Sequence, residues 1–218
     1  MPTTPFESLL DHVDPGFVCW LASGRSREEG YLKRVEHLAN PPADSNLLDR
    51  IPAVPGADVA RALYSRYNGA LLYTARDSMG GLRAPGLGVE IVPIDEWPER
   101  TEAMVHSWAF EEYDDAQMPY GRHDFVAFAY PRGASNHVHW VIAGPAAGSI
   151  YFWPWTMRPE LHTPPLARNF GAFITLLCTE PVHLLNDVFG CHWRAEEGLK
   201  EWIPSRYLPD CRNVQIKR

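Results

Sequence analysis

The order of elements along this chain of 218 residues predicts an α+β protein with a mainly antiparallel sheet. Three observations lead to this class. An amphipathic helix ends at Asn68-Gly69 and passes directly into an apolar run, a series of short strand-like segments comes next, and a second amphipathic helix closes the series. Strands and helices grouped in this way are typical of α+β domains.

The first 55 residues are predicted to form an N-terminal extension of short helices and loops. Ser26 and Glu29 have the spacing of a capping box, which predicts a helix that carries Tyr31, Leu32, Val35 and Leu38 on one side. Prolines between residues 41 and 55 end that helix and interrupt the rest of the extension. Residues 56–180 are predicted as the main domain, and 181–218 as a C-terminal extension with a short helix at about Glu196 to Trp202.

The main domain begins with a helix from Asp58 to about Asn68, whose predicted buried stripe is Val59, Leu63, Tyr64 and Tyr67. Asn68 and Gly69 tolerate the left-handed backbone that ends a helix, so Gly69 is expected to have a positive φ. This pair predicts a hinge between the helix and the first strand of the sheet.

Five strands are predicted after the hinge, several of them separated by glycine-rich turns. They are Ala70 to Thr74, Leu87 to Val92, Phe125 to Tyr130, Val138 to Ala143 and Ser149 to Trp153. The last three lie close together in the sequence, which favours an antiparallel meander.

Two helices accompany these strands. Pro98 fits the first turn of a helix from about Glu99 towards Asp114, with an apolar stripe at Met104, Val105 and Trp108. Leu166 to about Cys178 is predicted to bury Phe170, Phe173, Ile174 and Leu177.

Composition restricts the partners. The chain has 27 acidic and 20 basic residues, a net charge of −7, which argues against nucleic acid as a ligand and permits a basic protein partner. The four cysteines are scattered and suggest free thiols in a reducing compartment. Neither a signal peptide nor a membrane-spanning run is evident, so the protein is predicted to be cytoplasmic.

The motif His137-x-His139 is the first candidate for metal chemistry. On a strand, residues two apart share a face, so both imidazoles could reach one ion, with further ligands from His106, His123, Glu111 or Asp124. The same pattern is typical of a half-exposed antiparallel strand, and we prefer that interpretation. No metal or other cofactor is predicted.

An acidic cluster and an aromatic block are candidates for partner binding. The cluster is Glu111, Glu112, Asp114 and Asp115. A run of this kind is a solvated face, a docking patch for a basic partner, a pair of carboxylates for acid–base work, or a cation site. The block from Tyr151 to Trp155 includes Trp153 and Trp155, which are candidate anchors. Phosphate-binding glycine motifs and the G-x-S-x-G nucleophile motif are absent from the sequence, and no catalytic residue is predicted.

Several of these segments resemble the SUKH superfamily, which contains yeast cell-wall-synthesis regulators and bacterial toxin-immunity proteins. The matching landmarks are Tyr67-Asn68-Gly69 after a helix, the strand Leu87 to Val92 followed by an acidic helix start at Pro93 to Trp97, the strands Phe125 to Phe128 and Gly148 to Phe152, and the helix Asn169 to Leu177 with Phe170 and Phe173. The resemblance covers about residues 55–180. The long stretch from Met104 to Arg122 departs from the pattern.

The resemblance implies a sheet with helices packed against it that binds proteins and catalyses nothing. The leading hypothesis is an immunity protein that neutralises a cognate, basic toxin, such as a nuclease, by occluding it. The alternatives are a housekeeping scaffold of the same superfamily and a metal-dependent enzyme that uses His137 and His139.

Overall fold

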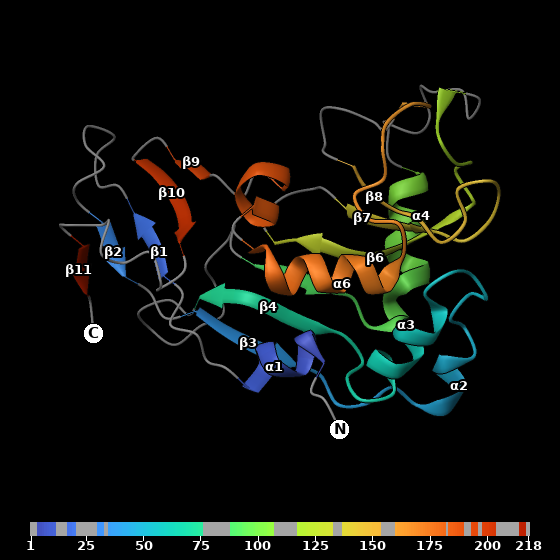
Figure 1. Cartoon of the computed structure of the whole chain (residues 1–218), viewed down its shortest axis with the longest axis horizontal. Helices are drawn as coiled ribbons and strands as arrows, with labels where there is room; N and C mark the ends of the chain where they lie inside the picture. The colour runs from blue at the N-terminus through green and yellow to red at the C-terminus, as the bar shows by residue number, and fades with distance from the viewer. Residues whose placement is uncertain are drawn as a thin grey trace.

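The chain forms a six-stranded antiparallel sheet covered by helices, in agreement with the predicted α+β class (Figure 1). The computed structural model describes residues 4–11, 17–20, 30–32, 35–75, 88–106, 117–132, 137–153, 160–181, 183–189, 193–195, 198–203 and 214–216. The strand order follows the chain: β3 (Val35–Ala39), β4 (Ala70–Ala75), β5 (Val89–Ile91), β6 (Phe125–Pro131), β7 (His137–Val141) and β8 (Ile150–Trp153).

The last three strands form the predicted meander. Phe125 pairs with Val141 across β6 and β7, and His139 pairs with Tyr151 across β7 and β8. These pairings are local in the sequence, because only residues 132–136 and 142–149 separate the three strands, and local pairings can be predicted.

Helices lie on both sides of this sheet. They are α1 (Pro5–Asp11), α2 (Ser45–Leu48), α3 (Ala57–Tyr64), the 3₁₀ turn η2 (Ile94–Glu96), α4 (Trp97–Val105), α6 (Phe170–Thr179) and the π-helical turn η4 (His183–Val188). In Figure 1, α6 crosses the near face of the sheet and α4 lies behind it. Among the described residues, no helix combines the length and apolar character that a membrane span requires.

Two hydrophobic cores fill the two sides. The larger core joins α3, α6 and η4 to one face of the sheet, and the predicted residues Phe170, Phe173, Ile174 and Leu177 are all buried in it. The smaller core holds Met104 of α4 against Phe125, Tyr151 and Trp153. The oxygen of the Asn169 side chain accepts a hydrogen bond from the amide of Ala172 (2.9 Å), so Asn169 caps α6.

The N-terminal segment differs from its prediction as short helices and loops. The predicted helix with Tyr31, Leu32, Val35 and Leu38 is replaced by β2 (Gly30–Leu32) and β3. β3 pairs antiparallel with β4 and forms an edge of the main sheet, and Phe6 and Ile51 are buried in the larger core. Residues 35–55 therefore share the sheet and core of the predicted main domain.

The C-terminal segment also differs. The predicted helix at Glu196 to Trp202 overlaps β10 (Gly198–Ile203), which lies between β1 (Phe17–Trp20) and β9 (Trp193–Ala195). β11 (Val214–Ile216) pairs parallel with β2. Leu184, Leu185 and Phe189 pack into the larger core beyond the predicted boundary at residue 180.

Helix α3 buries a different stripe from the predicted one. Val59 is 39% exposed, and Ala60 takes its place in the core. Tyr67 was expected to fill the core, but it is half-buried beside Phe6, with ring centroids 5.9 Å apart. Tyr64 is the fully buried tyrosine of this helix.

Candidate binding surface around helix α4

The predicted hinge at Asn68-Gly69 holds three segments together. Gly69 has a φ of 85°, as expected from the sequence. The side-chain oxygen of Asn68 accepts a hydrogen bond from the amide of Ile94 (2.9 Å), and its nitrogen donates to Asp95 (3.0 Å). The side chain of Asn40 donates to the Asn68 carbonyl (2.9 Å). The hinge therefore fixes the start of η2 and α4.

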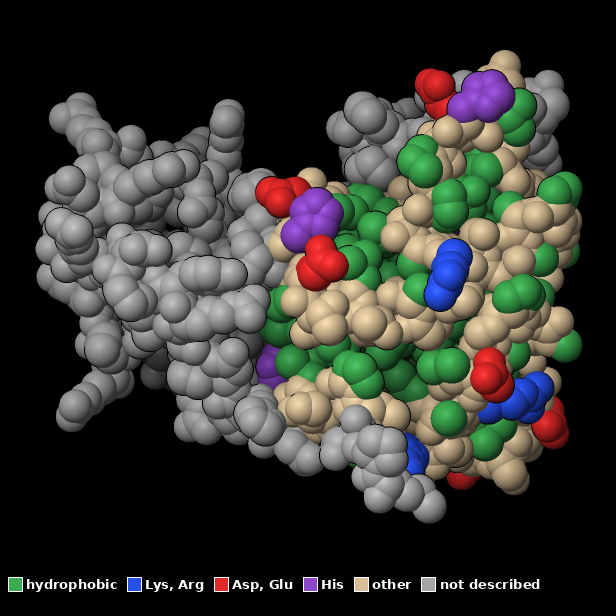
Figure 2. Space-filling view, in the orientation of Figure 1, with side chains coloured by type: hydrophobic (Ala, Val, Ile, Leu, Met, Phe, Trp, Pro, Cys, Tyr) green, Lys and Arg blue, Asp and Glu red, His purple; other side chains and the backbone are tan. Residues whose placement is uncertain are grey.

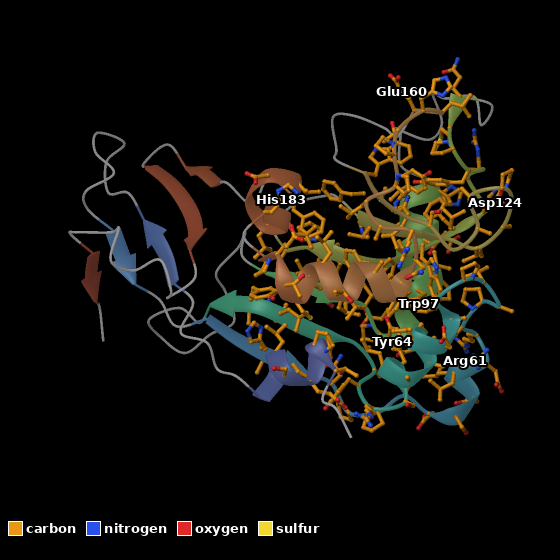
Figure 3. All side chains as sticks on the ribbon, in the orientation of Figure 1. Arg61, Tyr64, Trp97, Asp124, Glu160 and His183 are labelled. Atoms are coloured by element: carbon orange, nitrogen blue, oxygen red, sulfur yellow. The ribbon has the colours of Figure 1, made fainter. Side chains whose placement is uncertain are left out.

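The buried carbonyl of Val92 also holds the start of α4 in place. It accepts hydrogen bonds from the Tyr64 hydroxyl (2.9 Å) and from the indole nitrogen of Trp97 (3.1 Å). Tyr64 and Trp97 lie close together (Figure 3), and their rings meet edge to face with centroids 5.3 Å apart. Burial raises the pKa of Tyr64, so its hydroxyl remains a donor. Trp97 is thereby fixed at the first residue of α4.

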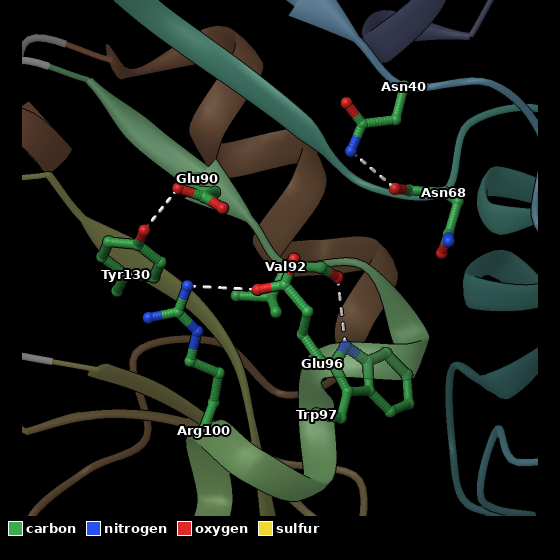
Figure 4. Close-up of polar contacts among 8 residues, drawn as sticks. All are labelled: Asn40, Asn68, Glu90, Val92, Glu96, Trp97, Arg100 and Tyr130. Carbon is green, nitrogen blue, oxygen red and sulfur yellow. Dashed lines mark hydrogen bonds and ion pairs between the residues drawn. The ribbon is translucent and has the colours of Figure 1, made fainter. Parts of the chain in front are cut away.

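A chain of polar contacts ties α4 to the sheet. The Tyr130 hydroxyl donates to Glu90 on the neighbouring strand, and the Arg100 guanidinium lies 5.0 Å from the centre of the Tyr130 ring. Arg100 also forms an ion pair with Glu96 at 3.1 Å (Figure 4). Burial and the contact with Glu90 raise the pKa of Tyr130 to about 12. The positive charge of Arg100 is therefore already engaged within the protein.

A hollow of about 430 Å³ opens beside α4. Ile94, Trp97 and Val105 give it an apolar lining on the helix side, and Val126 contributes from β6. Its polar lining comes from Arg50, Thr101, Glu102, His106 and His123. An apolar depression with a few polar groups at its margin is the usual form of a ligand or side-chain pocket.

The net charge of the protein is concentrated in the segment that contains α4. Residues 94–115 contain eight of the 27 acidic residues and one of the 20 basic residues. The rest of the chain therefore has 19 of each, and this segment accounts for the whole net charge of −7. Glu99 and Glu102 are exposed on α4, and within the described part of the chain neither of them pairs with Lys or Arg.

The face of the sheet covered by α6 has few charged side chains (Figure 2). Helix α6 contains no charged residue, and its exposed hydroxyls, those of Thr175 and Thr179, donate to carbonyls of the same helix. Figure 2 views this face and shows that charged side chains are sparse over the helix. Electrostatic attraction of a basic partner is therefore expected at α4 rather than at α6.

His139 is part of the smaller core. It is fully buried, its ring stacks on Phe125 with centroids 4.1 Å apart, and its Nδ1 is hydrogen-bonded to the Tyr120 hydroxyl (2.8 Å). Burial, with a smaller contribution from His137, lowers the pKa of His139 well below its usual value. This arrangement is that of a neutral core histidine.

We expect His139 to make the fold sensitive to acid. An unfolded histidine binds a proton near pH 6.5, whereas the buried ring does not, so acidification favours the unfolded state. Stability should be nearly insensitive to this group above about pH 7.5 and should fall by about 1 kcal/mol as the pH drops from 6.5 to 5.5. Below that range the slope should approach about 1.4 kcal/mol per pH unit.

Urea unfolding across that range, compared with His139→Gln, would measure this effect. The variant should be less stable at pH 7.5 and should lack this part of the pH dependence. Equal slopes for the two proteins would contradict the prediction.

The candidate metal ligands are distributed over different parts of the fold. His137 and His139 both lie on β7, whereas His106 and His123 line the hollow. The Asp124 carboxylate accepts a hydrogen bond from the amide of Gly121 (3.2 Å). No three His, Cys, Asp or Glu side chains within the described ranges are grouped as metal ligands.

The candidate partner-binding residues have mixed outcomes. Glu111, Glu112, Asp114, Asp115 and Trp155 lie outside the described residues. Trp153 was a candidate surface anchor, but it is 2% exposed and packs in the smaller core beside His139, so it is a core residue. No pattern in the sequence indicated the hollow, whereas a count of charges in a sliding window identifies residues 94–115 as acidic.

No known protein-family profile matches the chain, and no curated protein matches its sequence.

Proposed function

We propose that this chain is a non-catalytic, cytoplasmic protein-binding domain that neutralises a cognate toxin, in the manner of the SUKH immunity proteins it resembles. One observation carries the proposal: the entire net charge of the protein lies in the segment of 22 residues that contains α4. Toxins that act on nucleic acid need a positive surface, so an acidic segment of this kind is complementary to them.

The proposed mechanism is occlusion guided by charge. Concentrated charge accelerates encounter with an oppositely charged surface, by roughly 10- to 1,000-fold at low salt. Glu111, Glu112, Asp114 and Asp115 supply the steering charge. The fixed start of α4, tied to the sheet through Asn68 and Trp97, supports the surface with little loss of entropy on binding.

Co-expression with the product of the adjacent gene, followed by a pull-down and an assay of growth protection, tests the function. Capture together with protection supports it. Capture without protection would favour the scaffold alternative, and an adjacent product that is neither bound nor neutralised would contradict the proposal.

The steering role can be tested by reversing Glu111, Glu112, Asp114 and Asp115 to Lys. With the captured toxin, we expect the association rate at low salt to fall at least roughly tenfold and its salt dependence to weaken, while the dissociation rate changes little. Stopped-flow measurements at several ionic strengths give both rates.

A matched control reverses four exposed acids away from the hollow, Asp58, Glu160, Glu180 and Asp187, and changes the net charge equally. This control should reduce the association rate much less. An association rate that is unchanged in the first variant, or equally reduced in both, would remove the steering role.

A further inference from the structure

We infer that the hollow beside α4 is a receptor pocket for a large aliphatic side chain of a partner, presented between lysine or arginine residues. This inference rests on the proposed function, because it names the surface that a basic partner would use. The sequence predicted that Trp153 and Trp155 of this chain anchor the complex. In the present proposal the partner supplies the anchoring side chain and this chain supplies the pocket that receives it.

The lining of the hollow fits an apolar side chain. Its volume of about 430 Å³ lies in the range of pockets that hold ligands or anchor residues. Trp97 and Ile94 are almost completely buried and form the rigid base of the hollow. Val105 and Val126 are half-buried, so they leave apolar surface that a bound side chain can cover. Pockets of this kind receive the residues that dominate binding energy in protein interfaces.

The floor of the hollow is preorganised. The Trp97 indole is held by the Val92 carbonyl and packs edge to face on both Tyr64 and Trp140, with centroids 5.3 and 6.3 Å apart. Thr101, which also lines the hollow, accepts a hydrogen bond from the amide of Ala127 (3.0 Å), so it fixes α4 against β6. An occupant therefore meets a surface that needs no rearrangement.

The charges around the hollow favour cations next to the anchor. Glu102 lines it, 3.8 Å from the ring nitrogen of His106, and Glu99 is exposed one helical turn earlier on α4. Arg100, the only Lys or Arg of residues 94–106, is engaged by Glu96 and Tyr130. Arg50 lines the hollow from the end of α2 and is the feature that would instead favour a carboxylate. The experiment therefore includes acidic probes.

Three peptides of defined sequence serve as probes. They are acetyl-Lys-Lys-Leu-Lys-Lys-amide, the same peptide with Gly for Leu, and acetyl-Glu-Glu-Leu-Glu-Glu-amide. Nuclear magnetic resonance titration follows the Trp97 indole and the methyl groups of Val105 and Val126. We expect saturable shifts of these signals with the first peptide and affinity roughly tenfold weaker without the leucine. The acidic peptide should not bind.

Two variants and their matched controls localise the interaction. Glu102→Lys should weaken binding of the first peptide several-fold, whereas Glu160→Lys, an equal charge change at an exposed loop, should not. Val105→Trp should fill the hollow and abolish the contribution of the leucine, whereas Leu161→Trp, at a side chain 55% exposed elsewhere, should have no effect. Unfolding curves for each variant confirm that it is folded.

The inference is overturned if the leucine and glycine peptides bind equally, if the acidic peptide binds better, or if both members of a matched pair act alike. Its failure is distinct from failure of the proposed function. A toxin that is neutralised equally by Val105→Trp would leave the function standing without the pocket. Peptide binding in the hollow, with no capture of the adjacent gene product, would leave the pocket without the function.

Discussion

Gly69→Val is expected to destabilise the protein by about 3 kcal/mol or more, a large fraction of the stability of a typical domain. Gly69 has a φ of 85°, a backbone conformation that β-branched residues strongly disfavour. A Cβ at this position would lie 2.4 Å from the carbonyl oxygen of Ile91 and 2.9 Å from the nitrogen of Pro93. Both are backbone atoms of the adjoining strand and loop, so neither can move aside without breaking the hinge.

Urea unfolding measures the effect, and Gly144→Val is the matched control. Gly144 also has a positive φ, of 74°, but a Cβ there would meet only a carboxylate oxygen of Asp124 at 3.9 Å. The control therefore contains the backbone strain without the collision, and we expect it to lose only about 1–2 kcal/mol. Equal losses at the two positions would show that the close approach of β4 and β5 at Gly69 is not a determinant of stability.

Phe170→Ala is expected to be as damaging as Gly69→Val and to lower the free energy of unfolding by about 3–5 kcal/mol. Phe170 is fully buried where α6 meets the sheet and α3. Its ring centroid lies 5.2 Å from that of Trp140, 5.3 Å from Phe128 and 6.2 Å from Tyr64. These large, rigid rings cannot collapse fully into the space that the alanine leaves, so the cavity adds to the lost burial.

Phe170→Leu keeps most of the volume and should lose only about 1 kcal/mol, and Leu161→Ala, at an exposed position, should stay within about 0.5 kcal/mol of the parent protein. Chemical denaturation with tryptophan fluorescence resolves these differences, because Trp140 reports on the same core. A loss below about 1.5 kcal/mol for Phe170→Ala would mean that α6 is not fixed to the sheet through this residue.

The strands from β4 to β8 and the helix α6 could be predicted because their signals are local. The Asn68-Gly69 pair ends a helix at a position that requires positive φ, and the apolar runs of the meander are separated by short turns. The four buried residues of α6 follow helical periodicity. In each case a few neighbouring residues are sufficient to choose the backbone conformation.

Local signals of this kind were misleading where pairing with a segment distant in the sequence determines the backbone conformation. Val35 and Leu38 fit a helical stripe, yet they lie in β3 because β4 provides a row of backbone donors and acceptors for it. The segment from Gly198 to Ile203 is a strand because it pairs with β1, which lies near the opposite end of the chain. The energy of strand pairing depends on which segments meet in the fold, so the periodicity of a single segment does not predict it.

For the candidate binding surface as well, some properties follow from the local sequence and others follow from long-range packing. The location of the charge can be read from the sequence, since the acidic residues from Asp95 to Asp115 can be counted directly. The burial of Trp153, the hydrogen bond between His139 and Tyr120, and the apolar hollow beside the charged helix depend instead on how the segments pack in three dimensions. Conformation and charge are properties of short segments, whereas burial and shape arise only when segments distant in the chain pack together.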